Sequence, residues 1–350
     1  MTNLFYREKP IIGLDISQTG IKVMAVDPKK WLVTAYGSVD LDPAKVHASL
    51  EGDDDYLETN LRALLSKNLI GTLPSSHVVL SVPTSRTFTR TFSLPLSSEK
   101  HLKDAVELEI DQYIPLPSST LYVDYEVVER LKESIVVSMS AAPRTLIDRC
   151  IEVIEKIDLR VCAVEPGVNA VARLLEKTEE GHLPTVIIDI GPAGTDIAVL
   201  DRSIRVTGSL SVGGNTFTLD IAKKLKVPLE NAHQLKVING LNAGPRQQKL
   251  RSALTPSIDR ILNETRKVIR YYTERVENNK KLEQVLVVGG GSNVPGIGEH
   301  FTNALVMPAR VASPWQRLNF GTLPEPPKQF RSRYITVAGL ASVAPEEILR

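Results

Sequence analysis

An internal repeat constrains this chain more than any other feature of its sequence. Residues 15–23 read Asp-Ile-Ser-Gln-Thr-Gly-Ile-Lys-Val, and residues 189–197 read Asp-Ile-Gly-Pro-Ala-Gly-Thr-Asp-Ile, so Asp, Ile and Gly recur at a constant offset of 174 residues (189 − 15). Each segment lies between two short apolar runs, which is the pattern of a strand, a glycine-containing turn and a second strand. The repeat indicates a duplicated fold in which both halves contain the same β-hairpin.

The elements expected after each hairpin also correspond. A third strand is predicted at 31–39 and at 204–210, helices follow in both halves, and a buried strand ends each pattern at 77–82 and at 284–288. Two copies of a β-β-β-α-β unit predict an α/β protein with two duplicated mixed-sheet domains. At 350 residues the chain is long enough for both.

The stretch between the two copies has a different pattern. A strand is predicted at 86–94, then a helix capped by Ser98, then two strands at 122–128 and 135–139. This strand–helix–strand–strand order is typical of a small inserted domain, which makes the first domain discontinuous in sequence.

These patterns divide the chain into successive segments. We predict a first core at 1–83, the insert at 84–158, the rest of the first core at 159–183, a second core at 184–330 with its own insert at about 223–281, and a C-terminal helix at 331–350 that returns to the first core.

An aspartate at the end of a strand, followed by a glycine turn, suits a phosphorylated ligand. Backbone N–H groups of the turn can hold phosphate oxygens, and the carboxylate can hold a magnesium ion, usually through waters. Two such hairpins predict a nucleotide whose magnesium is held by Asp15 and Asp189. The residues predicted to contact the phosphates are Asp15, Ser17, Gln18, Thr19, Gly20 and Lys22, then Gly191, Gly194, Thr195 and Asp196, and then Gly213, Gly214 and Asn215.

A third glycine-rich segment, residues 285–296, runs from a strand into three consecutive glycines and then to Pro295, which we expect in the first turn of a helix. Without side chains, the glycines let the backbone approach a flat ligand closely. Val294 stands where a dinucleotide-binding fingerprint requires glycine, and the chain contains no Gly-Lys-Ser/Thr of a P-loop. The residues predicted around an adenosine group are Gly289, Gly290, Gly291, Ser292 and Pro295, with Glu264 and Lys267 from a long helix at about 254–278.

The charge balance argues against a nucleic-acid-binding protein. Lys and Arg number 42 against 41 Asp and Glu, which leaves no basic excess to gather on one face. The one basic stretch, 328–333, is interpreted as a solvated loop. No apolar run approaches the roughly 18 residues of a membrane span, so we expect a cytoplasmic protein that reaches a membrane through a partner, with no direct insertion.

The three glycine motifs resemble, in their usual order, the phosphate-1, phosphate-2 and adenosine motifs of the actin, sugar-kinase and heat-shock-chaperone ATPase superfamily. Residues 163–170 (Ala-Val-Glu-Pro-Gly-Val-Asn-Ala) resemble the first connecting motif of bacterial actins, and residues 336–341 (Thr-Val-Ala-Gly-Leu-Ala) resemble the second. The resemblance implies an actin-like ATPase fold that binds ATP and Mg²⁺. It also implies that Glu165 orients the attacking water. The alternative is that Glu165 lies at a helix N-terminus, where carboxylates are favoured for electrostatic reasons alone.

The insert restricts the resemblance to two families within this superfamily. A strand–helix–strand–strand module, the SHS2 or 1C-type domain, occurs at this position in the FtsA family of cell division and in the PilM family of type IV pilus assembly. The opening stretch 5–16 and the segment 214–218 are similar to the PilM family. FtsA proteins typically end in a linker and an amphipathic membrane-targeting helix, whereas this sequence stops at Arg350, soon after the second connecting motif. The chain therefore resembles the PilM family more.

That resemblance implies a component of the pilus assembly machinery at the inner membrane. Its implied partners are the N-terminal cytoplasmic peptide of a PilN-like membrane protein and further copies of itself in a ring or filament. Ser17 and Pro192 stand where the family motifs have glycine, and Pro192 also lacks an N–H for phosphate, so ATP hydrolysis is expected to be weak or absent. Two alternatives stay open: an FtsA-like filament-forming ATPase and, less expected, a metabolite kinase of the same superfamily.

Overall fold

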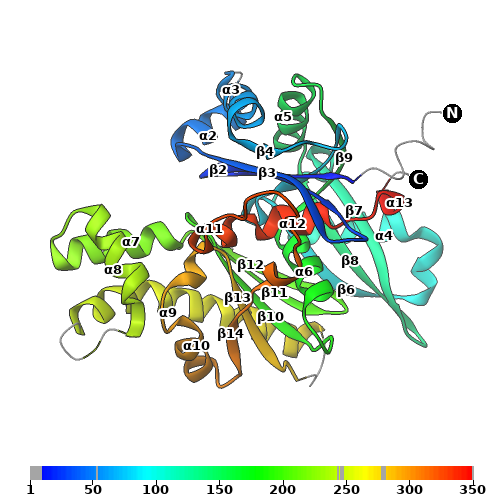
Figure 1. The fold of residues 1–350 in the computed structure, drawn as a ribbon. Helices are drawn as coiled ribbons and strands as arrows, with labels where there is room; N and C mark the ends of the chain where they lie inside the picture. Colours follow the sequence, from blue (N-terminus) through cyan, green and yellow to red (C-terminus); the bar gives the residue numbers. More distant parts are fainter. Residues whose placement is uncertain (1–9, 53, 243, 245–247, 277–280, 349–350) are drawn as a thin grey trace. The chain divides into compact units, whose positions relative to one another are not determined.

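The computed structural model describes residues 10–52, 54–242, 244, 248–276 and 281–348. It divides into two compact units (Figure 1). The first unit comprises Met1–Lys177, Gln316–Glu325 and Thr336–Arg350, and the second comprises Thr178–Trp315 and Pro326–Ile335. Three parts of the sequence predictions lie outside the described residues: residues 5–9 of the opening stretch compared with the PilM family, the end of the long helix expected to reach residue 278, and the last two residues of the C-terminal segment.

The first unit contains a six-stranded mixed sheet with the order β4-β3-β2-β1-β5-β9. Its strands are β1 (Ile12–Ser17), β2 (Gly20–Asp27), β3 (Leu32–Asp40), β4 (Leu69–Gly71), β5 (His77–Val82) and β9 (Arg160–Pro166). The strands β1 to β4 pair antiparallel, whereas β5 runs parallel to both β1 and β9. Parallel neighbours need crossover connections, which explains the helices between them.

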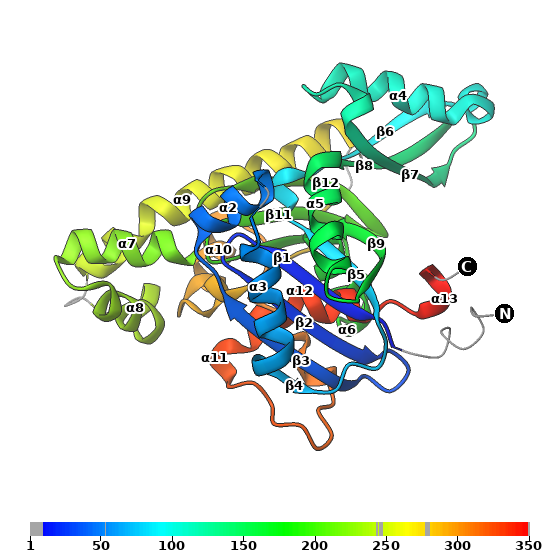
Figure 2. The same ribbon diagram turned by 90° about the horizontal axis from the view of Figure 1, so that it is seen from above.

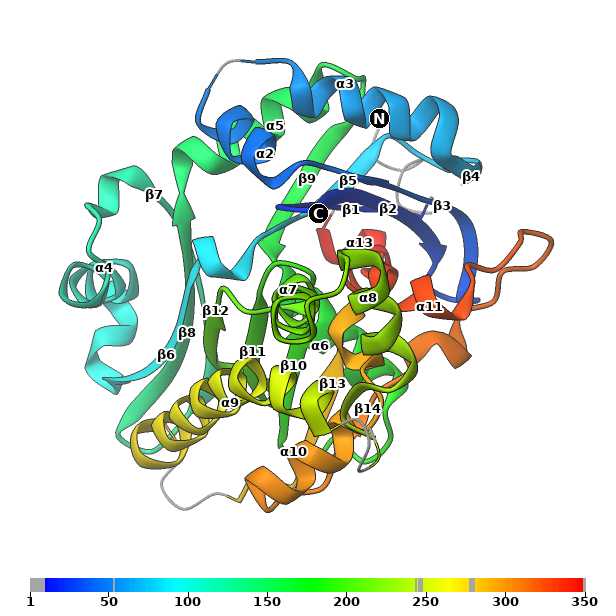
Figure 3. The same ribbon diagram turned by 90° about the vertical axis from the view of Figure 1, so that its left-hand side faces the viewer.

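Helices cover both faces of this sheet (Figures 2 and 3). On one face lie α2 (Pro43–Glu51), α3 (Tyr56–Ala63) and α5 (Arg144–Glu155), which share an apolar core with β1, β2 and β5. On the other lie α6 (Gly167–Thr178) and α12 (Ile335–Ala341). The helix α12 packs so closely on β1 that a Cβ at Gly13 would lie 2.8 Å from the Cβ of Leu340, so this contact requires glycine.

The predicted insert has the expected strand–helix–strand–strand order. It consists of β6 (Phe88–Pro95), α4 (Leu102–Tyr113), β7 (Leu121–Arg130) and β8 (Ser134–Pro143), with β8 between the other two strands. Val106 and Ile110 anchor α4 to this small sheet. The predicted cap at Ser98 is wrong, because the 3₁₀ segment η3 (Leu96–His101) covers it and α4 begins after His101 without a side-chain cap.

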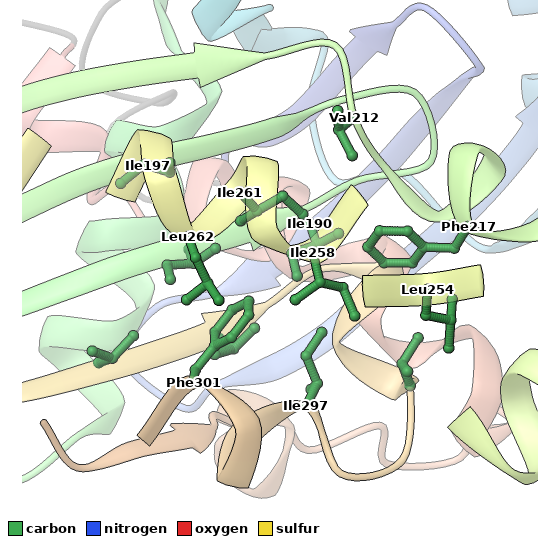
Figure 4. Packing of buried hydrophobic residues seen from close by; sticks show 14 of the residues in the cluster. Ile190, Ile197, Val212, Phe217, Leu254, Ile258, Ile261, Leu262, Ile297 and Phe301 are labelled. Atoms are coloured by element: carbon green, nitrogen blue, oxygen red, sulfur yellow. The ribbon is translucent and has the colours of Figure 1, made fainter. Parts of the chain in front are cut away.

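The second unit repeats the plan of the first. Its strands follow the order β14-β13-β10-β11-β12. They are β10 (Thr185–Ile190), β11 (Thr195–Asp201), β12 (Ser203–Leu210), β13 (Gln284–Val288) and β14 (Ala309–Val311). The longer helices described in this unit are α7 (Gly214–Leu225), α8 (Leu229–Ile238), α9 (Gln248–Tyr271) and α10 (Ile297–Leu305). Phe217, Ile258 and Phe301 join α7, α9 and α10 to the sheet in one buried core (Figure 4).

Several short elements differ from the sequence predictions. The helix α2 was missed, although Asp42 caps it by accepting hydrogen bonds from the N–H groups of Ala44 and Lys45, a signal that the sequence contains. The basic stretch 328–333 is not a loop; it forms α11 (Lys328–Arg331) and the 3₁₀ turn η10 (Ser332–Tyr334). Pro295 precedes α10 and is not in its first turn. Across the described ranges, no helix is long and apolar enough to cross a membrane.

Candidate functional site

Charged side chains close the first hairpin. The Lys22 ammonium lies 2.7 Å from Oδ2 of Asp15, its register partner across β1 and β2, and 3.0 Å from Oγ of Ser17. Ser17, which replaces the usual glycine, donates from its hydroxyl to the carbonyl of Gly20 at 2.9 Å. The Asp15 and Lys22 side chains are 13% and 14% exposed, so this ion pair is only slightly screened by water.

A residue that the sequence analysis missed completes this arrangement. Ser81 on β5 donates its hydroxyl to Oδ1 of Asp15 at 2.5 Å, so both carboxylate oxygens of Asp15 are bound. The register pairs of the sheet are Lys22 with Asp15, Asp15 with Ser81, and Ser81 with Glu165. Register partners lie on one face of a sheet. The phosphate-1 hairpin and the first connecting motif therefore contribute to a single row of polar side chains.

Glu165 lies near the end of β9 as predicted, directly before α6. Pro166 is the last residue of the strand and not part of the helix. Arg173 of α6 binds both carboxylate oxygens of Glu165, with distances of 2.7 Å from Nη1 to Oε1 and 2.5 Å from Nη2 to Oε2. This ion pair gives Glu165 a structural role, and its predicted role in orienting water stays a prediction.

Backbone groups close the second hairpin. The N–H of Gly191 donates to the carbonyl of Gly194 at 2.8 Å, and the first N–H groups of α7, from Gly214 and Asn215, donate to the carbonyls of Gly191 and Pro192 at 2.9 Å each. A Cβ at Gly213 would overlap the carbonyl of Gly191, so glycine is required there. The proline that replaces glycine in this motif thus contributes its carbonyl to the junction between hairpin and helix.

The predicted phosphate contact Thr195 has a buried side chain. Its hydroxyl donates to the carbonyl of Val212 at 2.6 Å, which ties β11 to the segment before α7. Asp196, by contrast, is the register partner of Asp189 across β10 and β11. Carboxylate oxygens are ligands that suit magnesium, either directly or through waters. The chemistry of Asp189 and Asp196 therefore fits a hydrated divalent cation.

A buried lysine near the second hairpin was also missed. Lys236 of α8 is 7% exposed, and its ammonium donates to the carbonyl of Gly214 and to the hydroxyl of Thr218, both at 2.8 Å. Burial lowers the pKa of Lys236 from 10.5 to about 8, because desolvation disfavours the charged form. Lys236 holds the first turn of α7 against α8.

The triple glycine packs directly on the second hairpin. Gly289 has a φ of +79°, and a Cβ on it would overlap Oδ1 of Asp189 and lie 2.6 Å from the carbonyl of Ile190. A Cβ on Gly290 would meet nothing within 4 Å, so this position is open, as an approach to a flat ligand requires. Ser292 is buried and its hydroxyl donates to the carbonyl of Gly289 at 2.7 Å, so its side chain stabilises the turn.

The remaining predicted adenosine residues are Glu264 and Lys267 on α9, and Pro295 directly before α10. Glu264 and Lys267 form an ion pair of 2.9 Å on α9, and a Cβ at Gly208 of β12 would lie 3.7 Å from Oε1 of Glu264. The carbonyl of Pro295 accepts a hydrogen bond from the N–H of Leu241. Within the described part of the chain, no group of three or more His, Cys, Asp and Glu side chains could hold a metal ion. A magnesium ion here would thus depend on waters and phosphate oxygens for most of its ligands.

A family model described as type IV pilus assembly protein PilM matches residues 13–343. The chain belongs to the PilM family. It is also 31% identical to the cell division protein FtsA of Borreliella burgdorferi over 156 residues, 39% of this chain and 38% of that protein, so this match spans well under half of the relative's length. FtsA of Buchnera aphidicola is 21% identical over 338 residues, 88% of this chain and 78% of that protein.

Solved structures agree on the fold. The solved structure of a PilM–PilN type IV pilus biogenesis complex matches with a TM-score of 0.78 at 19% identity. The match covers 95% of this PilM-family chain and 98% of the chain in that structure. The ethanolamine utilization protein EutJ of Carboxydothermus hydrogenoformans has a TM-score of 0.54 at 17% identity, and the match covers 95% of this chain and 89% of EutJ. MreB5 of Spiroplasma citri, bound to ADP, has a TM-score of 0.51 at 15% identity, with 95% of each chain covered. The predicted actin-like fold is confirmed.

Proposed function

We propose that this chain is a cytoplasmic, ATP- and Mg²⁺-binding component of the type IV pilus assembly machinery at the inner membrane. In this proposal it docks the N-terminal cytoplasmic tail of a PilN-like membrane protein and hydrolyses ATP weakly or not at all. The family match over residues 13–343 carries the proposal, and the similarity to a PilM–PilN complex supports the choice of partner.

The geometry of the hairpins supports the nucleotide part of this function. Lys22 and the N–H groups of the first turn are suited to phosphate oxygens, since an ammonium and backbone donors complement an anion. Asp15, Asp189 and Asp196 would hold magnesium through waters, and Gly290 leaves room for the adenosine. Magnesium would neutralise the phosphate charge. The bonds from Arg173 to both oxygens of Glu165 favour binding of ATP over its hydrolysis.

Reversing the charge of Asp189 tests the magnesium site. Asp189→Lys places a cation where the proposal needs a magnesium ligand, so magnesium-dependent ATP affinity should fall at least 100-fold by titration calorimetry, a loss of about 2.7 kcal/mol. The matched control is Asp259→Lys, because Asp259 is an exposed aspartate of α9 in the same unit and outside the predicted site. Equal ATP affinity in the parent and the Asp189 variant would refute the proposed site.

The partner is tested with a synthetic PilN-like tail peptide. The parent chain should bind this peptide and should not sediment as filaments when ATP is added. A second candidate, an FtsA-like filament-forming ATPase, is favoured by the similarity to FtsA over 88% of the chain. It would show the opposite result, ATP-dependent sedimentation without peptide binding.

A further inference from the structure

Arg173 binds both carboxylate oxygens of Glu165. Two parallel hydrogen bonds, of 2.7 Å and 2.5 Å, join the guanidinium to both oxygens, which is the strongest geometry for such a pair. The side chains are 25% and 15% exposed, so competition from water is limited. Glu165 therefore directs both of its oxygens towards Arg173.

Arg173 is itself held in place. Its Nη1 also donates to the carbonyl of Gly339 in α12 at 3.1 Å. The helices α6 and α12 cross so closely here that a Cβ at Gly339 would overlap the carbonyl of Ala170. Arg173 thus bonds to both β9 and α12. If its guanidinium turned away from Glu165, the hydrogen bond to the carbonyl of Gly339 would also be lost.

The position of Glu165 is nevertheless suited to chemistry at the first hairpin. Glu165 is in register with Ser81, and Ser81 donates to Asp15. A carboxylate in this row, if it were not bound by a guanidinium, could accept a proton from a water next to the phosphates. Positioned acid–base groups of this kind contribute roughly 10²–10⁴-fold to a rate.

We propose that Arg173 is a positioning residue that keeps Glu165 out of ATP hydrolysis, so that the chain retains bound ATP. This inference rests on the proposed function, because it requires ATP at the two hairpins. In the suppressed step, a water oxygen forms a bond to the γ-phosphorus while the bond from that phosphorus to the β–γ bridging oxygen breaks. ADP leaves with the electron pair of that bond, and the water's proton passes to a Glu165 oxygen.

Arg173→Met is the central test, measured by phosphate release in a single turnover. Methionine keeps an unbranched apolar chain in place of the arginine methylenes and removes the guanidinium. Phosphate release should therefore rise at least tenfold, while ATP affinity by calorimetry stays within about twofold of the parent's. In the double variant Glu165→Gln with Arg173→Met, release should return to the parent's rate. The melting temperature should fall in Arg173→Met, which leaves Glu165 unpaired, and recover partly in the double variant.

Lys177→Met is the matched control. Lys177 lies one turn later on α6, and its ammonium donates to the carbonyl of Ser342, just after α12, at 2.7 Å. This variant loosens α6 from the same region without changing Glu165. Its phosphate release should equal the parent's, which separates the freeing of Glu165 from a general loosening between the two helices.

Three results would overturn the inference. The first is a folded, ATP-binding Arg173→Met protein that releases phosphate at the parent's rate. The second is a rise that persists in the double variant. If Arg173→Met does not fold, Arg173→Lys replaces it, because lysine keeps the charge but not the two parallel bonds. The third overturning result is phosphate release at the parent's rate in Arg173→Lys. A parent that binds no ATP would instead refute the proposed function, and the inference with it.

Discussion

The two hairpins follow the same backbone path but are stabilised in different ways. In the first, side chains from three strands meet at Asp15, where Lys22 and Ser81 bind one carboxylate oxygen each. In the second, main-chain groups provide several of the contacts, with the carbonyls of Gly191 and Pro192 accepting from the first N–H groups of α7. The duplication therefore preserved the hairpin geometry while the interactions that hold it diverged.

One pair of equivalent positions shows what this difference means. Position 22 and position 196 are related by the same offset of 174 as the two aspartates (196 − 22), and each is the register partner of its aspartate. The first hairpin has lysine there and so contains its own counter-charge. The second has Asp196 opposite Asp189. The two hairpins therefore have opposite charges at these equivalent positions.

The largest expected effect separates two neighbouring glycines of the adenosine motif. Gly289→Ala combines a left-handed φ of +79° with an overlap against Asp189, so we expect a loss of about 3 kcal/mol in the free energy of unfolding. Gly290→Ala meets open space and should stay within about 0.5 kcal/mol of the parent. Urea denaturation measures both. A loss in Gly289→Ala as small as that in Gly290→Ala would show that the second hairpin tolerates a side chain at Gly289.

A smaller loss is expected when the counter-charge of the first hairpin is removed. Lys22→Met leaves the largely buried Asp15 without its cation, so the free energy of unfolding should fall by about 2 kcal/mol. Adding Asp15→Asn should restore part of that loss, because no charge is then left unpaired. Lys156→Met, at an exposed ion pair with Glu152, is the control and should leave stability close to the parent's. If both lysine variants behaved alike, the first hairpin would not depend on its internal charge pair.

Local patterns predicted the fold well. The two hairpins, the strands after them and the strand–helix–strand–strand insert each depend on periodicity and turn residues within a short window, and all were found. Glu165 was correctly placed between a strand and a helix for the same reason. The mistake at Ser98 shows the limit of such patterns, since Ser98 lies within the 3₁₀ segment that precedes the helix.

The contacts that organise the site could not be predicted from local patterns. Ser81 is 66 residues from Asp15, and only the register of the sheet brings their side chains together. Arg173 is eight residues from Glu165, yet it reaches both oxygens because α6 turns back along β9. No local pattern in the sequence distinguishes Lys236 from other lysines. Its burial depends on how α8 packs against α7, and the sequence of α8 does not reveal this packing.

The smallest expected effect concerns that lysine and the pH dependence of the second hairpin. The pKa of Lys236 is lowered by burial from 10.5 to about 8, so between these values the unfolded chain binds more protons than the folded chain. Relative to Lys236→Met, the parent should therefore gain stability from about pH 8 to about pH 10.5, on the order of 1 kcal/mol. The raised pKa of Cys150 acts in the opposite direction, but it is common to both proteins. The nearby His233 does not contribute in this window, because its pKa is lowered from 6.5 by burial and by Lys236. The exposed Lys224 of α7 provides the control, and Lys224→Met should follow the parent in urea denaturation across this pH range. A difference between the parent and Lys236→Met that stays constant across this pH range would mean that Lys236 keeps its charge in the folded protein.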